Sequence, residues 1–407
     1  MIAALLLALA QARPSAVVVL IDDVGSDMID ATLTPTIASM QAEGFTFTNA
    51  WAAPSCSPTR AALLTGRYGH RTGIGQNIGP NPTWSFQSSE TTIAERVRAR
   101  GYATGLIGKW HLGQDLEQPC DNGFQTWTGT KANLGSSGGY YAWPRVDDTP
   151  TMQAVTSTQN GYSTTDLTDL AVEWIGAQSE PYFLLLNYNA AHVPEHCPPA
   201  SLQSECTGFE LGGLPWYRGM VQSVDTELAR LLGAVDRTST TVIVLGDNGT
   251  PTQYGGGKGS MYSGGIDVPF VVWGAAVDQS CQNGDSDDGH ANVVDVYRTV
   301  LRLLPGSDLV PQPQLDSVSL YGGGAFRSVR GWNFIERFEP LGAGPHTDLS
   351  RACEQNGFKA IWTLTTVELY DVVSDPGETV DLLADGIDPA EQAILDGLEA
   401  IVVGLGA

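Results

Sequence analysis

A cysteine and an arginine share one short stretch that can bind an anion. The segment PSCSPTRAALLTG, residues 54–66, places Cys56 four residues before Arg60. Pro58 suits the first turn of a helix and Gly66 can end it, so the spacing predicts Cys56 at a helix N-terminus. That end attracts anions, and Arg60 offers a planar fork of donors to a tetrahedral oxyanion. A plain thiol is a soft nucleophile, poorly suited to attack phosphorus or sulfur(VI).

Two acidic pairs follow two apolar runs. Asp22 and Asp23 come after residues 16–21, and Asp247 and Asn248 come after residues 241–246. One such pair can simply end a strand or cap the next helix. The second pair, placed in the same way, favours a shared role. Because carboxylate and amide oxygens suit Ca²⁺ or Mg²⁺ and are poor ligands for copper or zinc, we predict one metal site.

Further basic groups and histidines stand near strand ends. Lys109 and His111 lie two residues apart, so on an extended segment they point to the same side. His192 follows the apolar run 182–188, and Lys258 lies in GGGKGSMYSGG, where glycines let backbone approach an anion closely. Each residue alone is equally typical of an exposed or structural side chain. Together they predict a site for a small anionic group.

The elements that must position these residues alternate along the chain. Apolar runs at 16–21, 102–108, 182–188 and 241–246 are typical of buried parallel strands, and residues 91–101 and 220–235 have helical periodicity. This order predicts an α/β fold with a large, mostly parallel sheet flanked by helices. Ligands of such sheets bind beyond the carboxyl ends of the strands, where the residues above would meet.

The chain changes character after about residue 320. Residues 327–338 and 358–373 favour antiparallel strands, and residues 388–405 form an amphipathic closing helix with an acidic first turn. The Gly- and Pro-rich stretch 303–325 marks a boundary. We therefore predict a catalytic domain over residues 13–322 and a small antiparallel C-terminal α+β domain over residues 323–407.

Charge and the N-terminus limit partners and location. Acidic residues outnumber basic ones 45 to 21, a net charge of −24, which argues against a nucleic-acid partner or an anionic membrane surface. An apolar run over residues 2–10 and the small-x-small sequence Ala10-Gln11-Ala12 predict a signal peptide over residues 1–12. The run is too short to span a bilayer. We expect a periplasmic or secreted protein without a stable membrane anchor.

The cysteine content also suits an oxidising compartment. The six cysteines are too sparse for a disulfide-built scaffold. With Cys56 reserved for chemistry, an odd number remains and at least one must stay free: Cys120, Cys197, Cys206, Cys281 and Cys353. Cys197 and Cys206 are the closest pair in sequence, and the sequence leaves the pairing open.

Several motifs together resemble the sulfatase family. PSCSPTRAALLTG resembles the first signature of the family and GYATGLIGKWH the second, and the Asp-Asp pair, GDNG, GGKGSMYSGG and VELYDVVSDPGE follow in the family's order. The resemblance covers nearly the whole chain beyond residue 12. It implies a fold similar to alkaline phosphatase and a sulfuric ester hydrolase of the arylsulfatase type.

The resemblance also implies a role for each site residue. A maturation enzyme would oxidise Cys56 to formylglycine, whose hydrate attacks the sulfur of a small aryl or carbohydrate sulfate. The bound Ca²⁺, with Mg²⁺ as the alternative, would be held by Asp22, Asp23, Asp247 and Asn248. Arg60 and Lys109 would steady the hydrate, Lys109 and Lys258 would contact sulfate, His192 would protonate the leaving oxygen and His111 would take a proton from the second hydroxyl.

One motif departs from the family pattern. Relatives often read Tyr-Glu-Gly-Gly-x-Arg-Val-Pro, whereas this chain has Ser263 and Asp267 at the Glu and Arg positions. In the family these two residues are expected to organise the loop behind Lys258. The departure therefore concerns the placement of that lysine.

Two other functions stay open from the sequence. One is a phosphonate or phosphate ester hydrolase of the same superfamily, and the other is a catalytically silent calcium-bound binding protein with an unmodified Cys56. The substrate would be chosen by the loops 75–90, 114–165 and 195–217, where several aromatic residues can either stack on a ring or pack internally. These residues are Trp84, Trp127, Tyr140, Tyr141, Trp143 and Trp216.

Overall fold

The structure is a computed structural model that describes residues 13–135, 139–179, 181–207, 212–307 and 314–407. The predicted signal peptide, residues 1–12, lies outside the described residues. No helix among the described residues is both long and apolar enough to cross a membrane.

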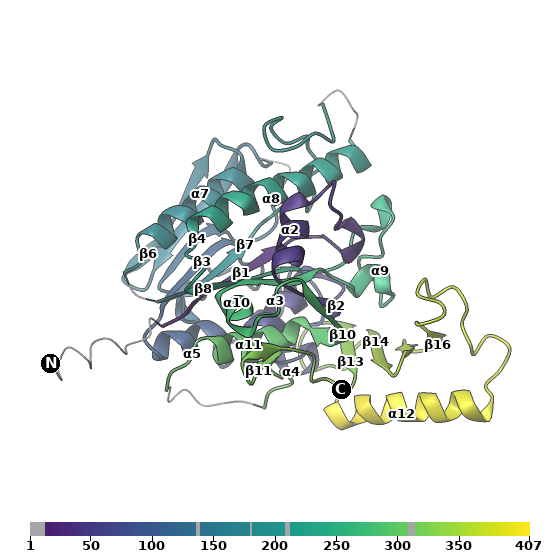
Figure 1. Cartoon of the computed structure of the whole chain (residues 1–407). Coiled ribbons are helices and arrows are strands. Elements are labelled where there is room, and N and C mark those ends of the chain that lie inside the picture. The colour runs from purple at the N-terminus through teal and green to yellow at the C-terminus, as the bar shows by residue number, and fades with distance from the viewer. Residues whose placement is uncertain (1–12, 136–138, 180, 208–211, 308–313) are drawn as a thin grey trace.

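A large mixed sheet forms the centre of the molecule (Figure 1). It has ten strands in the order β10-β2-β9-β8-β1-β7-β3-β4-β5-β6. Strands β8, β1, β7, β3 and β4 run parallel as a central block, whereas β9, β5 and β6 are antiparallel to their neighbours. The bounds are β1 Ser15–Ile21, β2 Phe45–Trp51, β3 Ala103–Lys109, β4 Thr126–Thr130, β5 Trp143–Thr149, β6 Met152–Gln159, β7 Tyr182–Asn187, β8 Thr240–Gly246, β9 Phe270–Gly274 and β10 Asp285–Asn292.

Helices cover both faces of this sheet, because successive side chains of a buried strand point to opposite sides. Val18 of β1 belongs to one apolar core and Val17 to the other. Helices α3 (Cys56–Thr65), α5 (Ile93–Ala99) and α11 (Val296–Leu303) pack on the first face. Helices α2 (Pro35–Glu43), α7 (Ser163–Gly176) and α8 (Leu214–Ala234) pack on the second. The prediction of a mostly parallel sheet flanked by helices is confirmed.

Shorter helices lie in the connections. They are α4 (Gly69–Thr72), α6 (Gln118–Asp121), α9 (Ser263–Ile266), α10 (Ala275–Ser280) and the 3-10 turns η1 (Ser26–Met28), η2 (Thr252–Tyr254) and η3 (Val293–Asp295). The helix predicted over residues 91–101 is α5, which begins after Thr92. The Thr92 hydroxyl accepts from the Glu95 amide at 3.1 Å, and the Glu95 carboxylate accepts from the Thr92 amide at 2.7 Å. Such a capping box fixes the start of a helix.

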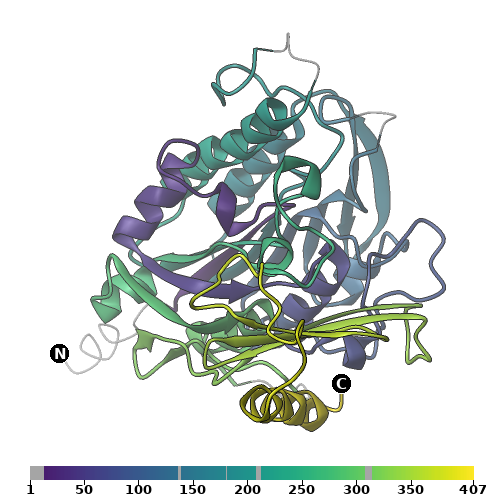
Figure 2. The same ribbon diagram turned by 90° about the vertical axis from the view of Figure 1, so that its right-hand side faces the viewer.

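A smaller antiparallel sheet follows near the C-terminus (Figure 2). Its order is β13-β14-β15-β16, and helix α12 covers it. The bounds are β13 Asn333–Glu339, β14 Asp348–Gln355, β15 Phe358–Trp362, β16 Val367–Asp371 and α12 Pro389–Leu405, and a two-stranded hairpin, β11 Tyr321–Gly322 with β12 Ala325–Phe326, precedes them. The strands and the closing helix predicted from sequence are present, while β14 was not predicted. The domain boundary between residues 322 and 323 stays a prediction.

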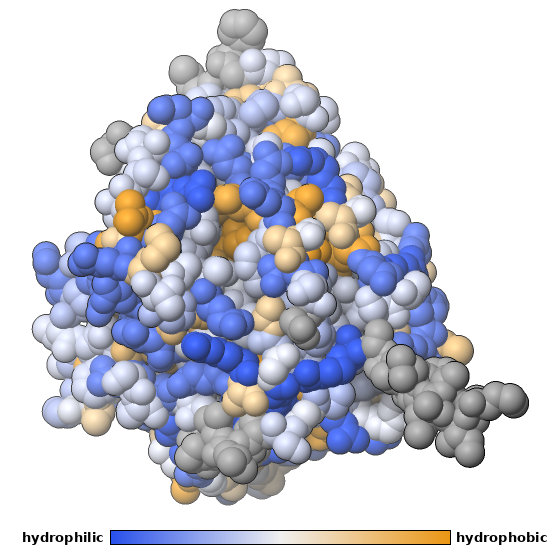
Figure 3. Space-filling view, turned by 90° about the vertical axis from the view of Figure 1, so that its left-hand side faces the viewer, coloured by the Kyte–Doolittle hydropathy of each residue, from blue (hydrophilic) through white to orange (hydrophobic). Residues whose placement is uncertain are grey.

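The face turned toward the viewer in Figure 3 is mostly hydrophilic. Its apolar residues gather in the middle of the face, and polar residues surround them. This distribution agrees with the acidic composition, a net charge of −24 over 407 residues.

Candidate active site

The two acidic pairs meet at the carboxyl edge of the parallel block. β1 ends at Ile21 and β8 at Gly246, and these two residues are register partners. Asp22 and Asp23 are both buried, and Asp23 has a φ of 60°. This left-handed backbone breaks the alternation of an extended strand, so that both carboxylates reach the same cluster. The Asp23 amide donates to Asp247 Oδ1 at 3.0 Å.

Cys56 lies in the centre of these oxygens. It is the first residue of α3, and Gly66 ends that helix with a φ of 69°, as the sequence predicted. The Cys56 Sγ is 3.4 Å from Asp22 Oδ1, 4.0 Å from Asp23 Oδ1 and 3.5 Å from Asn248 Oδ1. Burial, followed by the charges of Asp22 and Asp247, raises the pKa of the thiol well above its ordinary value. The unmodified side chain is therefore a neutral thiol.

Three cations enter the same cluster. Lys109 pairs with Asp22 and Lys258 pairs with Asp23. Arg60 Nη2 lies 2.7 Å from Asp247 Oδ2 and 3.3 Å from Asp22 Oδ2. Burial opposes the charge on Arg60, but the carboxylates outweigh it, and the pKa of the guanidinium is raised.

The end of β3 is shaped by a close backbone contact. Gly108 has a φ of 97°, and a Cβ there would lie 1.9 Å from the Asn187 carbonyl oxygen of β7. Only glycine fits, and the next residue, Lys109, is then fully buried against the acid cluster. The Lys109 carbonyl accepts from Asn187 Nδ2 at 2.8 Å and from Arg60 Nη1 at 3.2 Å. The lysine is thus held by both neighbouring elements.

His111 is buried and neutral. Burial, followed by the charges of Lys109 and Arg60, holds the pKa of His111 well below its ordinary value. Its Nδ1 is enclosed and has no hydrogen-bond partner among the described residues. A neutral imidazole with a vacant nitrogen can accept a proton. Helix α3 holds the backbone of His111 in place, because Ser57 Oγ of that helix donates to the His111 carbonyl at 2.7 Å.

His192 approaches from the turn after β7. Its Nε2 lies 4.0 Å from Asp23 Oδ2, and its Nδ1 lies 2.7 Å from the Val193 carbonyl oxygen. Burial acts to raise the pKa of Asp23, but the charges of Lys258 and His192 outweigh it, and the pKa is lowered. The buried phenol of Tyr140 fixes this turn, since its oxygen is 2.6 Å from the carbonyl oxygens of both Asn189 and His192.

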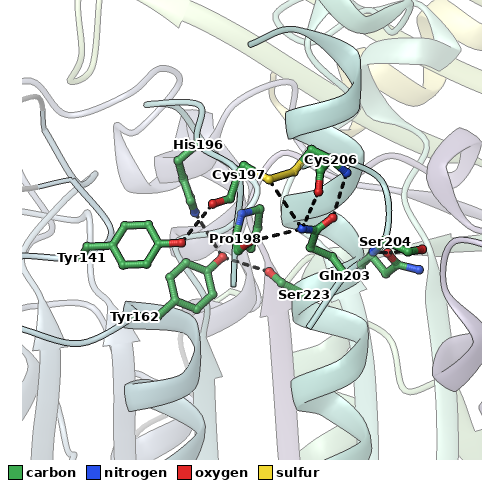
Figure 4. Close-up of a disulfide and its surroundings, with 10 residues drawn as sticks. Tyr141, Tyr162, His196, Cys197, Pro198, Gln203, Ser204, Cys206 and Ser223 are labelled. Carbon is green, nitrogen blue, oxygen red and sulfur yellow. Dashed lines mark hydrogen bonds between the residues drawn. A yellow bond between two sulfur atoms is a disulfide. The ribbon is translucent and has the colours of Figure 1, made fainter. Parts of the chain in front are cut away.

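A disulfide ties the loop that follows His192 (Figure 4). It joins Cys197 and Cys206, the pair closest in sequence. Cys56, Cys120, Cys281 and Cys353 are free cysteines. Beside the disulfide, His196 Nε2 is 3.1 Å from the Tyr162 hydroxyl, and Tyr141 donates to the Cys197 carbonyl at 2.9 Å. His196 therefore points to this aromatic group and not to the acid cluster.

The donor set fits a hard divalent cation. Ligand atoms of Asp22, Asp23, Cys56 and His192 lie within 4.8 Å of one another. Three carboxylates and the amide of Asn248 supply only oxygen ligands, the chemistry that Ca²⁺ and Mg²⁺ prefer. In this structure Arg60, Lys109 and Lys258 offset the negative charge of the buried carboxylates. The group that includes Cys56 and His192 shares Asp22 and Asp23 with the predicted metal site, whereas Asp247 pairs with Arg60, and the ligand set of Asp22, Asp23, Asp247 and Asn248 stays a prediction.

Some residues of the site carried no sequence signal. Tyr217 of α8 donates to the Asp23 carbonyl at 2.6 Å, and its ring stacks on Tyr254 with centroids 4.3 Å apart. Tyr140 was singled out only as a candidate stacking residue, whereas it is fully buried and fixes the His192 turn. Trp127 and Trp143 are also fully buried packing residues, while Tyr141 is 46% exposed.

The fold and the site have the form of an open α/β sheet with its functional residues at the carboxyl edge. Helices cover both faces of the sheet, and carboxylates and cations gather beyond its strand ends. The chain belongs to the sulfatase family, because the sequence model described as Sulfatase matches residues 14–307. Its relatives are named as sulfatases, which are sulfuric ester hydrolases.

Curated relatives agree with this family. Rat arylsulfatase G (Rattus norvegicus) is 27% identical over 369 residues, which cover 76% of this chain and 68% of the relative. Mouse N-acetylgalactosamine-6-sulfatase (Mus musculus) is 25% identical over 98% of this chain and 89% of its own length. Mouse arylsulfatase J is 27% identical over 71% of this chain, and the match spans about half, 51%, of that relative.

Solved structures support the fold. Ps i-CgsB in complex with k-i-k-neocarrahexaose has a TM-score of 0.80 at 22% identity, covering 96% of this chain and 92% of that one. A second structure, solved with its substrate D-glucosamine-2-N,6-O-disulfate, has a TM-score of 0.74 at 18% identity, covering 96% and 97%. At these identities the likeness establishes the architecture of the chain.

Proposed function

We propose that this protein hydrolyses sulfate esters, R-O-SO₃⁻ to R-OH and sulfate, at the cluster around residue 56. The observation that carries the proposal is the position of Cys56 at the start of α3, with its Sγ within 4.0 Å of oxygens from Asp22, Asp23 and Asn248 and of Lys258 Nζ. A small tetrahedral anion bound there would meet cations, a helix N-terminus and metal ligands together.

The chemistry of residue 56 favours its conversion to formylglycine. A buried neutral thiol is a poor nucleophile, and sulfur(VI) centres prefer attack by oxygen. The hydrate of the aldehyde would supply such an oxygen at the same position. Asp22, Asp23, Asp247 and Asn248 would hold a calcium ion, which would supply positive charge to orient a sulfate oxygen and to stabilise developing negative charge.

The remaining side chains would bind the anion and transfer protons. Lys109 and Lys258 would contact the sulfate group, and Arg60 with Lys109 would hold the nucleophilic residue in place. His192 would give a proton to the leaving oxygen. His111, neutral and buried, would accept the proton that is released when sulfate is expelled.

The relatives support a proposal for the substrate class. Relatives include arylsulfatases, an N-acetylgalactosamine-6-sulfatase and a structure solved with a disulfated glucosamine. We infer that the substrate is the sulfate ester of a ring compound, so that the departing alcohol is either a phenol or a sugar. The maturation enzyme that modifies Cys56 would be a required partner, and the predicted signal peptide would direct the protein to the periplasm or out of the cell.

The test is a comparison of esters together with mass spectrometry of residue 56. Protein produced with a formylglycine-generating enzyme should hydrolyse 4-nitrophenyl sulfate faster than 4-nitrophenyl phosphate and 4-nitrophenyl phosphonates. The peptide with residue 56 should carry an aldehyde, and Cys56→Ala should abolish turnover without a change in fold. Preference for the phosphorus esters would instead identify a phosphate or phosphonate ester hydrolase, and full activity with only thiol at residue 56 would refute the formylglycine.

A further inference from the structure

The loop that carries Lys258 is built into a stack of glycine backbones. The Gly257 amide donates to the Gly264 carbonyl at 2.9 Å, and the Gly249 amide donates to the Gly265 carbonyl at 2.9 Å. A Cβ on Gly265 would lie 2.4 Å from the Ser260 carbonyl oxygen, so no side chain fits between these segments. The position of Lys258 therefore depends on the position of α9, Ser263–Ile266.

In this chain α9 is held from outside the catalytic sheet. The Ser263 amide donates to Glu378 Oε2 at 2.6 Å. Glu378 is 8% exposed and belongs to the segment after β16. Its other oxygen, Oε1, lies 2.5 Å from Lys359 Nζ of β15. A side chain from the segment after β16 thus reaches the turn next to the active site.

The pair Lys359–Glu378 is itself held between the two sheets. Lys359 is fully buried, and its Nζ lies 4.9 Å above the ring of Trp51, a residue of β2 in the large sheet. Lys359, Trp51, Ser263 and Asp267 line one cavity of about 170 Å³ at this junction. Lys359 Nζ and Glu378 Oε1 are both enclosed, so removal of either partner would leave the other charge buried and unpaired.

This arrangement accounts for the departure from the family motif. The residues expected to organise the Lys258 loop are Glu and Arg, and here Ser263 and Asp267 stand in their places. Ser263 offers its backbone amide to a carboxylate that comes from residue 378, and the cation comes from residue 359. The acid and the base are present, but the base comes from β15 and the acid from the segment after β16.

We propose that Glu378, paired with Lys359, is a positioning residue that sets Lys258 for the sulfate group through α9. The proposal rests on the proposed function, in which Lys258 contacts sulfate. The C-terminal sheet then acts on substrate affinity without touching substrate.

The experiment is a double-mutant cycle on Glu378 and Lys258. For each variant, 4-nitrophenyl sulfate is the substrate, inorganic sulfate is the inhibitor, and the inhibition constant of sulfate is measured. Glu378→Ala should raise that constant about tenfold, the scale of one charge-assisted hydrogen bond. Lys258→Ala should raise it at least as much, and adding Glu378→Ala to Lys258→Ala should cause no further rise. Glu378→Gln, which keeps an oxygen for the Ser263 amide, should fall between wild type and Glu378→Ala.

The matched control is Glu336→Gln in the same sheet as Lys359. Glu336 is a buried glutamate of β13 whose Oε1 accepts from the His70 amide at 2.7 Å, and it does not line the cavity that Lys359, Ser263 and Asp267 share. This variant should leave the sulfate constant unchanged. If Glu378→Ala and Lys258→Ala raise the sulfate constant independently and additively, the positioning role is overturned. If Glu378→Ala does not fold, Glu378→Gln decides, and an unchanged sulfate constant in that variant also overturns the role. If Lys258→Ala alone leaves the sulfate constant unchanged, the proposed role of Lys258 fails, and this inference fails with it.

Discussion

The His192 ring faces the acid cluster with one defined nitrogen. Its Nδ1 lies against the Val193 carbonyl at 2.7 Å, which leaves Nε2 toward Asp23 at 4.0 Å. Proton donation from a positioned side chain contributes about 10²- to 10⁴-fold, and it matters most for a poor leaving group. We expect His192→Ala to lower kcat/KM for an alkyl or sugar sulfate by about 100-fold or more. The loss on 4-nitrophenyl sulfate should be much smaller.

His196 provides the matched control for that measurement. It lies in the same loop, but its ring contacts Tyr140 and Tyr162. His196→Ala should therefore leave the ratio of the two substrates unchanged. If His192→Ala lowers kcat/KM equally for substrates with good and with poor leaving groups, another group must donate the proton. Lys258 is then the next candidate.

Asp267 gives the protein a pH-dependent stability. Burial raises the pKa of Asp267 from 3.8 to about 7, and the charge of Glu378 adds to the effect while that of Lys359 opposes it. The folded state thus binds this proton more tightly than the unfolded chain, so stability is lost as the pH rises through about 7. Asp267→Asn should be more stable than wild type at pH 8 by about 1–4 kcal/mol.

The advantage of Asp267→Asn should shrink as the pH falls from 8 toward 4. Thermal unfolding of both proteins across that range measures it. An advantage that stays constant with pH would show that the side chain is ionised throughout and that the variant acts through packing alone.

The polar residues of the site could be found from sequence because each stands directly after a buried run or inside a short motif. Asp22 and Asp247 are separated by more than half the chain, yet strand ends of a parallel sheet share one edge. Tyr217 could not be found in this way, because its partner, the Asp23 carbonyl, is a backbone group far away in sequence. Glu378 ends the motif VELYDVVSDPGE, but the motif does not reveal that its partner is the distant Ser263 amide.

At the scale of elements, strand ends bring carboxylates and their partner cations together at the proposed calcium site. Asp22, Asp23 and Asp247 are all buried. An ion that binds only the folded protein stabilises it by about 2.7 kcal/mol at 100 times its Kd. We expect added Ca²⁺ to raise the Tm and chelation to lower both the Tm and the activity. Asp247→Asn should remove most of the calcium-dependent rise.

Asp225→Asn is the control for the calcium experiment. Asp225 is equally buried, but it lies on α8 and accepts from the amides of Thr36 and Ile37 at 2.9 and 2.8 Å. This variant should lose stability and still respond to Ca²⁺. An active protein with the same Tm in chelator and in Ca²⁺ would contradict the metal site.

Elements with a clear apolar pattern were predicted, and those without one were not. β1, β3, β7 and β8 are buried on both faces and read as continuous apolar runs. β6 is largely exposed, and β14 is buried only around Ala352. These strands form because a neighbour offers backbone hydrogen bonds, which side-chain periodicity does not reveal.

At the scale of the whole molecule, the two sheets share one apolar core. Phe334 of β13, Cys353 of β14 and Leu398 of α12 belong to the same cluster as Val18 of β1. The small C-terminal sheet therefore packs directly on the large sheet. The hydrogen bond from the Ser263 amide to Glu378 adds a second contact between the C-terminal region and the edge of the active site.

The net charge of −24 makes a prediction for polymeric substrates. A highly sulfated chain is repelled over about 30 Å at 0.01 M ionic strength but over only about 8 Å at 0.15 M. The cations of the active site, Arg60, Lys109 and Lys258, are paired with buried carboxylates. Their positive charge is therefore largely compensated, and they attract distant anions only weakly. We expect kcat/KM on a heparin-like chain to rise with salt over this range, while kcat/KM on a singly sulfated ester changes little. A rate on the polymer that falls as salt is added would contradict this expectation, and it would show that a basic surface near the site attracts polyanions despite the overall charge.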